Sequence, residues 1–229
     1  VGVAARDILV VPVAFKSVPL GVIVLGGGAT TLTAANTYNG GTFTHNSGTV
    51  TFNGTGAQAI TGTATSQTFY NVVIAKTADT TLSVSGSTAT LNINNLTLTS
   101  GIFAAGSATT INVTGDWTNN GGTFTGGTGT VTFNNTTATQ SINGTAASQT
   151  FYNIIVAKTA QTLSVSGSTT TLNINNLTMT SGIFTAGTAI SINVTGNWTN
   201  NSASGLTWPT ATSWAGSTAR AKRPTGTRP

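Results

Sequence analysis

The sequence predicts an all-β protein, namely a parallel β-helix (β-solenoid) built from two repeats of about 81 residues. Three observations lead to this fold class. Apolar residues alternate with Thr, Ser and Asn in short runs, the period-two pattern of strands with one buried side. Gly, Asn and Ser interrupt these runs about every ten residues, as turns require. A long segment recurs almost unchanged, which indicates a repeat architecture.

The expected strands follow one another along each repeat. In the first repeat they are GTVTF, FYNVVIAK, TLSV, ATLNINNLTL and TTINVTGDW, all rich in β-branched or aromatic residues. No window shows the 3.6-residue period of an amphipathic helix. Charged residues make up only 5% of the chain, which suits neutral strand surfaces and not long surface helices.

The internal repeat is the clearest feature of the chain. Leu82–Gly106 and Leu163–Gly187 differ at only 3 of 25 positions, and the offset between them is 81 residues. The match extends over residues 40–201, with one residue inserted near Thr137 and one lost after Lys158. The expected organisation is an apolar N-terminal segment, two β repeat units and an irregular basic tail, with boundaries at 1–36, 37–120, 121–201 and 202–229.

Two architectures fit such units. In the solenoid, each unit forms four coils of about 20 residues, and eight coils rising ~4.8 Å each give a rod of ~38 Å. Asn side chains at the turns then form ladders along the axis. The alternative is a pair of tandem antiparallel β-sandwich domains, one per unit. Very short strands and the scarcity of two-residue hairpin turns favour the solenoid.

The two ends depart from the repeat. The first 36 residues are the most apolar part of the chain and fit either a cap hairpin or the remnant of an export signal. Residues 5–27, ARDILVVPVAFKSVPLGVIVLGG, also resemble the closing hairpin of a GAF-type sensor domain. After Asn201 the repeat breaks off into a basic tail, which predicts either disorder or an interrupted third unit.

The charge distribution argues against nucleic acid as a partner. The net charge is +5, but four basic residues lie between Arg220 and Arg228, and the body between residues 36 and 219 sums to zero. Phosphate binding needs cations gathered along one surface. The chain has no cysteine, so thiol chemistry and disulfides are excluded. Prolines and Lys16 interrupt the apolar N-terminal run, so no membrane span is expected.

The body lacks the residues of a recognisable catalytic centre, and no catalytic, cofactor or metal site is expected. Its acids are Asp79 and Asp116; the second repeat has no counterpart of Asp79 and carries Asn197 in place of Asp116. The one histidine, His45, corresponds to Gly126 and is expected in an exposed turn. No Ser-His-Asp set, metal cluster or phosphate loop can be assembled.

A few recurring residues are candidates for surface binding. Tyr70 and Tyr152 follow a Phe at matching positions and could offer a flat face to sugars, or else pack at the rim of the core. Lys76 and Lys158 each end a FYN-apolar-AK strand, where a solvated lysine discourages edge pairing. The aromatic pairs Phe43/Phe124 and Trp117/Trp198 mark the repeat, with the tryptophans at the handover between units.

The repeat pattern, with its GTVTFNG, TLNINNLTLTSGIF and INVTGDWTNNGGTF blocks, resembles bacterial secreted and surface β-strand-repeat proteins, including autotransporter and filamentous-adhesin-like passengers. The resemblance implies a non-enzymatic structural or adhesive segment of a bacterial surface protein, forming an extracellular rod. Alternatives are a subunit of a self-assembling fibre and a carbohydrate-binding or ice-binding β-solenoid, the last suggested by T-x-T patterns. The partners implied are the chain itself or cell-surface glycans.

Overall fold

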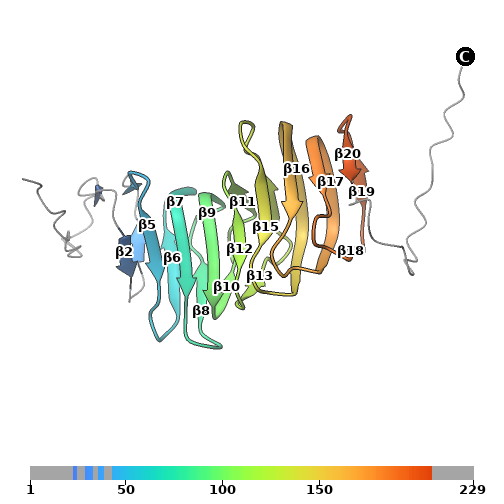
Figure 1. The fold of residues 1–229 in the computed structure, drawn as a ribbon. Coiled ribbons are helices and arrows are strands. Elements are labelled where there is room, and N and C mark those ends of the chain that lie inside the picture. Colours follow the sequence, from blue (N-terminus) through green and yellow to red (C-terminus); the bar gives the residue numbers. More distant parts are fainter. Residues whose placement is uncertain (1–22, 25–28, 33–35, 39–42, 208–229) are drawn as a thin grey trace, which may run out of the picture.

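The protein is a stack of short parallel strands wound around one axis, and strands are the only regular elements in its described part. The computed structural model describes residues 23–24, 29–32, 36–38 and 43–207. Every pairing between the described strands is parallel, which confirms the β-solenoid and excludes the antiparallel sandwiches. Figure 1 shows the strands side by side along the axis, over about seven turns.

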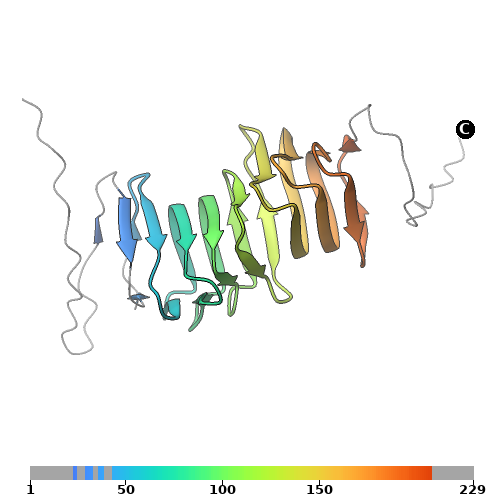
Figure 2. The same cartoon turned by 60° about the horizontal axis from the view of Figure 1, so that its bottom comes forward.

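The chain visits three faces in a fixed order on each turn, here called A, B and C. Face A begins with β2 (Ala29–Leu32) and β5 (Thr49–Phe52), face B with β3 (Asn36–Tyr38) and β6 (Gln58–Gly62), and face C contains the first half of β7 (Ser66–Ala75). The short β1 (Ile23–Val24) pairs with β4 (Phe43–Thr44). Figure 2 shows the faces of the stack from another side.

The later strands continue these columns, and the longest of them bend round a corner from one face to the next. They are β8 (Thr81–Val84), β9 (Thr90–Ser100), β10 (Ile102–Ala104), β11 (Thr110–Val113), β12 (Trp117–Asn119), β13 (Thr123–Thr125), β14 (Thr130–Phe133), β15 (Gln140–Asn143), β16 (Ser148–Val165), β17 (Thr171–Thr185), β18 (Ser191–Val194), β19 (Trp198–Asn200) and β20 (Gly205–Thr207).

The core runs without interruption through both repeats because inward side chains stack from turn to turn. On face A the register places Val50 beside Val72, Val72 beside Leu96 and Leu96 beside Trp117, all almost fully buried. Outward positions carry mainly Thr, Ser and Asn. The expected asparagine ladders are present: Asn95 Nδ2 donates to Asn71 Oδ1 at 2.9 Å. Each ladder satisfies amides that would otherwise compete with the strand backbone.

The repeat unit does not comprise whole turns, contrary to the expected four coils. β5 lies on face A, in the column that continues through β12 to β15. Its copy β14 lies on face C, next to β11. One unit therefore contains about eleven strand segments, or about three and two-thirds turns. The second unit therefore begins one face short of four whole turns, an offset of about 120° for a three-faced stack.

Close stacking of turns decides where glycine is required. Gly106 and its copy Gly187 have φ of 56° and 57°, and a Cβ on either would collide with the carbonyl oxygen of a valine one turn earlier. Glycine adopts this left-handed conformation without steric cost. The recurrence of the I-F-x-A-G ending in both repeats therefore reflects a turn that passes directly over the backbone of its neighbour.

Strands outside the two expected repeat units also pair with the stack at both of its ends. β2 and β3 pair in parallel with β5 and β6, so the described part of the 1–36 segment and its continuation belong to the solenoid. The expected cap hairpin, export signal and GAF-like hairpin fall mostly outside the described residues. At the other end β20 pairs with β17, and Leu206 packs against the core. The solenoid thus continues to Thr207, beyond the expected boundary at residue 202.

Candidate functional site

The two recurring lysines lie inside the protein, so their interpretation as solvated strand-end residues is wrong. Lys76 is 1% exposed and Lys158 is fully buried. Lys76 Nζ donates to the carbonyl oxygens of Gly54 and Gly56 at 2.5 and 2.6 Å and to Gln58 Oε1 at 2.7 Å. The ammonium group therefore satisfies backbone carbonyls of the loop between β5 and β6, one turn earlier.

Lys158 repeats this arrangement in the second unit. Its Nζ donates to Asn135 O at 2.9 Å, Ala138 O at 3.0 Å and Gln140 Oε1 at 2.8 Å. The loop between β14 and β15 holds the inserted residue, yet the same lysine–glutamine pair closes it. Burial lowers the pKa of Lys158 to about 8, while the nearby Asp116 carboxylate acts in the opposite direction. Burial also lowers the pKa of Lys76.

The two tryptophans that mark the repeat differ in exposure. Trp117 is fully buried beneath the next turn, whereas Trp198 on the last described turn is 44% exposed. The sequence predicts that Trp117 ends a strand, but it is the first residue of β12. Phe124 packs against its ring at a centroid distance of 4.8 Å. Phe43 lies in β4, and its side chain is outside the described part of the structure.

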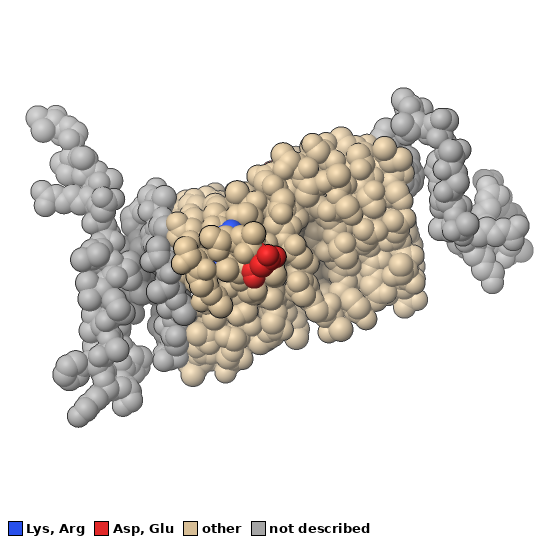
Figure 3. Space-filling view, turned by 90° about the horizontal axis from the view of Figure 1, so that it is seen from below, with Lys and Arg blue, Asp and Glu red and all other residues tan. Residues whose placement is uncertain are grey.

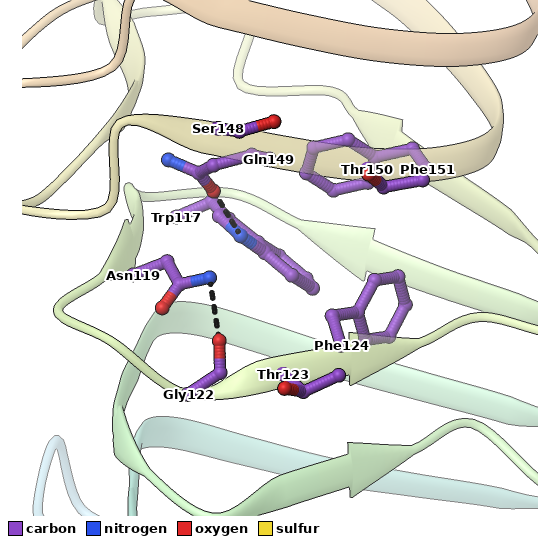
Figure 4. A pocket seen from close by; sticks show the side chains of 9 residues that line it. All are labelled: Trp117, Asn119, Gly122, Thr123, Phe124, Ser148, Gln149, Thr150 and Phe151. Atoms are coloured by element: carbon purple, nitrogen blue, oxygen red, sulfur yellow. Dashed lines mark hydrogen bonds between the residues drawn. The ribbon is translucent and has the colours of Figure 1, made fainter.

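A cavity of about 170 Å³ lies beside Trp117, where the two units meet. On face B, β13 and the first residues of β16 lie next to each other, but no strand pairing joins them among the described strands. Three aromatic rings fill this gap: Trp117, Phe124 and Phe151 (Figure 4).

The two amide side chains of this cavity, Gln149 and Asn119, already have partners within the protein. Gln149 Oε1 accepts from Trp117 Nε1 at 3.1 Å, and Gln149 Nε2 donates to Asn143 O and Thr169 Oγ1, each at 2.9 Å. Asn119 bonds to the turn that leads to β13 (Figure 4). These bonds hold the junction together, so we assign the cavity a structural role.

A second hollow, of about 240 Å³, lies on the outside of the first unit. It is here called the His45–Tyr70 groove. Tyr70 is half-buried at the corner between faces C and A, and its ring lies 5.6 Å from that of His45. His45 is therefore half-buried beside Tyr70, not fully exposed as expected. Tyr152, the counterpart of Tyr70, is 40% exposed.

The ice-binding alternative requires the same T-x-T pattern on successive turns. Thr49 and Thr51 instead lie beside Asn71 and Val73 on the next turn. In the second unit, Thr130 and Thr132 lie beside Asn153 and Ile155. Bulky aliphatic side chains interrupt both rows, so these positions form no continuous threonine array.

Comparison with protein-family models, curated proteins and solved structures gave no match. Within the described residues, no three His, Cys, Asp or Glu side chains lie close enough together to hold a metal ion. The described segments also include no helix with the length and apolar character needed to cross a membrane.

The buried lysines lead to a stability prediction. We expect Lys158→Met to lower the free energy of unfolding by about 1–3 kcal/mol, because methionine fills the space but leaves the carbonyl oxygens of Asn135 and Ala138 without their donor. Denaturant unfolding followed by circular dichroism measures the change. Thr136→Met, on the exposed part of the same loop, serves as control and should be neutral. A Lys158→Met variant as stable as the wild type would contradict this role.

The lowered pKa of Lys158 leads to a pH prediction. Between about pH 8 and the ordinary pKa of 10.5, the folded state has lost a proton that the unfolded state retains. Unfolding then takes up a proton, so the free energy of unfolding should rise with pH through this window and stay level just below it. Urea midpoints at pH 7 and pH 9.5 measure the rise. It should shrink in Lys158→Met; an equal rise in both proteins would contradict the assignment.

Proposed function

We propose that the chain is a non-enzymatic structural or adhesive segment of a bacterial secreted or cell-surface protein, and that it acts as a stiff extracellular rod. The observation that carries this proposal is the continuity of the core and of the strand columns on faces A and C through both repeats. A hinge between units would break these columns. Each turn adds ~4.8 Å, so repeats of this kind extend a rod by fixed increments.

The outer surface supports the same role. Its outward rows consist mainly of Thr, Ser and Asn, several of which bond to one another, and the ionisable groups of the body are few. On the face shown in Figure 3, Asp, Glu, Lys and Arg colour only two small patches of the described surface. This face offers neither a catalytic carboxylate pair nor a cation patch for nucleic acid. The resemblance to bacterial surface repeats points to the extracellular location.

Rigidity across the junction is directly measurable because the natural chain has no cysteine. Spin labels at Thr55→Cys and Ala203→Cys, both exposed, span the two units; labels at Thr55→Cys and Thr109→Cys lie within the first. We expect equally narrow distance distributions from both pairs in electron double resonance. A broad or two-peaked distribution for the spanning pair alone would indicate a hinge and contradict the rod.

A self-assembling fibre is the second candidate, favoured by the last described turn. There Trp198 and Ile190 are 44% and 75% exposed. In the first unit, β15 of the next turn pairs with β12 and covers Trp117. An end-on second copy would give Trp198 similar cover, so this association uses a packing already present once inside the chain.

The fibre candidate predicts association that depends on concentration and on Trp198. In sedimentation velocity, the sedimentation coefficient of the wild type should rise with protein concentration, whereas Trp198→Asp should remain a single species. Thr199→Asp introduces the same charge at the adjacent exposed position and should still associate more than Trp198→Asp. A wild type that is monomeric at all concentrations would contradict the fibre and leave the rod standing.

A further inference from the structure

We propose that the His45–Tyr70 groove is a binding site for a neutral sugar ring. The groove follows a corner of the stack across four turns, where Tyr70, Asn94, Thr114 and Asn134 occupy equivalent positions one after another. The residues directly before them are buried and lie side by side on successive turns: Phe69, Ile93, Val113 and Phe133. The lining is aromatic at the Tyr70 end and, apart from Ile93, carries amide or hydroxyl groups elsewhere.

The aromatic end has the form that sugar recognition needs. The ring centroids of His45 and Tyr70 lie 5.6 Å apart with 31° between the ring planes, so the two rings pack against each other. His45 Nδ1 accepts from the backbone N–H of Ser47 at 3.2 Å, which fixes the imidazole orientation. The C–H face of a pyranose can pack on the ring of such an aromatic pair, while its hydroxyl groups reach neighbouring polar side chains.

The polar side of the groove is held in place before any ligand arrives. Asn112 Nδ2 donates to Asn92 Oδ1 at 2.9 Å, and Asn92 Nδ2 donates to Ser66 and Thr68 hydroxyls at 3.1 and 3.3 Å. On the corner itself, Thr114 Oγ1 donates to Asn94 Oδ1 at 3.2 Å. Rigid amides lose little conformational freedom on binding, which favours even a small ligand.

One polar atom of the lining is left without a partner. The side-chain oxygen of Asn134 is buried and accepts no hydrogen bond within the protein. A buried acceptor without a donor costs free energy, and a ligand hydroxyl would supply the missing donor once the Asn134 side chain turns toward the groove. This distinguishes the groove from the cavity at Trp117, where Gln149 and Asn119 are bonded within the protein.

The class of ligand follows from what the groove lacks. None of its lining residues is an acid, a lysine or an arginine, so an ionic ligand would find no counter-charge. The strands beneath it, β7, β9, β11 and β14, are paired with one another, so no free strand edge is available to an extended peptide. At about 240 Å³ it is smaller than the roughly 300 Å³ at which pockets for larger ligands begin, which suits one ring.

The second unit contains a natural comparison. It repeats Tyr70, Asn92, Asn94, Asn112 and Thr114 as Tyr152, Asn173, Asn175, Asn193 and Thr195, with Gly126 in place of His45. The histidine is therefore what distinguishes the groove of the first unit among these residues. Tyr152 lacks that ring beside it, and we expect the second copy to bind weakly or not at all.

The test is an NMR titration of the whole chain with methyl glycosides of glucose, galactose, mannose and N-acetylglucosamine and with their β-1,4-linked disaccharides. We expect at least one of them to shift the amide resonances of Tyr70, Asn92 and Asn112. The expected dissociation constant is about 1 mM, the order for a ligand of about a dozen non-hydrogen atoms. No shift from any sugar at tens of times this concentration overturns the proposal.

Variants locate the site. Tyr70→Ala and His45→Gly, the latter copying the second unit, should each weaken binding at least fivefold, whereas Tyr152→Ala should leave it unchanged. His45→Gly removes one side-chain hydrogen bond at a half-buried position, so it tests the contribution of the imidazole ring without disturbing the core. Equal loss in Tyr70→Ala and Tyr152→Ala, or sugar binding unaffected by all three, would overturn the assignment. The result is independent of the rod, which the spin-label distances test.

Discussion

The parallel pairing of each turn with the next is the interaction on which this structure depends. Pairing fixes which residues of neighbouring turns lie side by side, and a slip of one residue would turn every inward side chain outward. The one-residue insertion near Thr137 and the deletion after Lys158 therefore cannot fall within paired segments. The insertion lies in the loop between β14 and β15, and the deletion lies where the register of β16 shifts between Ala157 and Thr162.

The same pairing creates the problem that the buried lysines solve. Where the chain leaves a strand to form the loop before β6 or β15, its carbonyl groups lose their strand partners inside the stack. A lysine reaching in from the next turn supplies three donors at once, and the adjacent glutamine accepts one of them while bonding the loop from the other side. A buried ammonium is costly unless it is fully hydrogen-bonded, and here each of its donors has an acceptor.

Much of the fold could be predicted from the sequence because it depends on alternation and repetition, which are properties of the chain itself. The positions of the lysines could have been predicted as well. Lys76 has the same parity as Val72 and Ile74, which places it inward, but the usual preference of lysine for solvent suggested the opposite. The proximity of His45 and Tyr70 was harder to see, since 25 residues separate them and the length of a turn must first be known. The different exposure of Trp117 and Trp198 depends on what covers each, not on their nearly identical surroundings in sequence.

The incomplete last turn of each unit affects how the repeats present a surface. One unit advances by about three and two-thirds turns. Tyr70 therefore follows a strand segment on face C, whereas Tyr152 follows the segment of β16 that lies on face B. Equivalent positions in consecutive units therefore point about 120° apart, and they return to the same side only after three units, or about eleven turns. At ~4.8 Å per turn that spacing is ~53 Å. A site carried once per unit would wind around such a rod, so successive copies would engage partners on different sides and would gain little avidity on one flat surface.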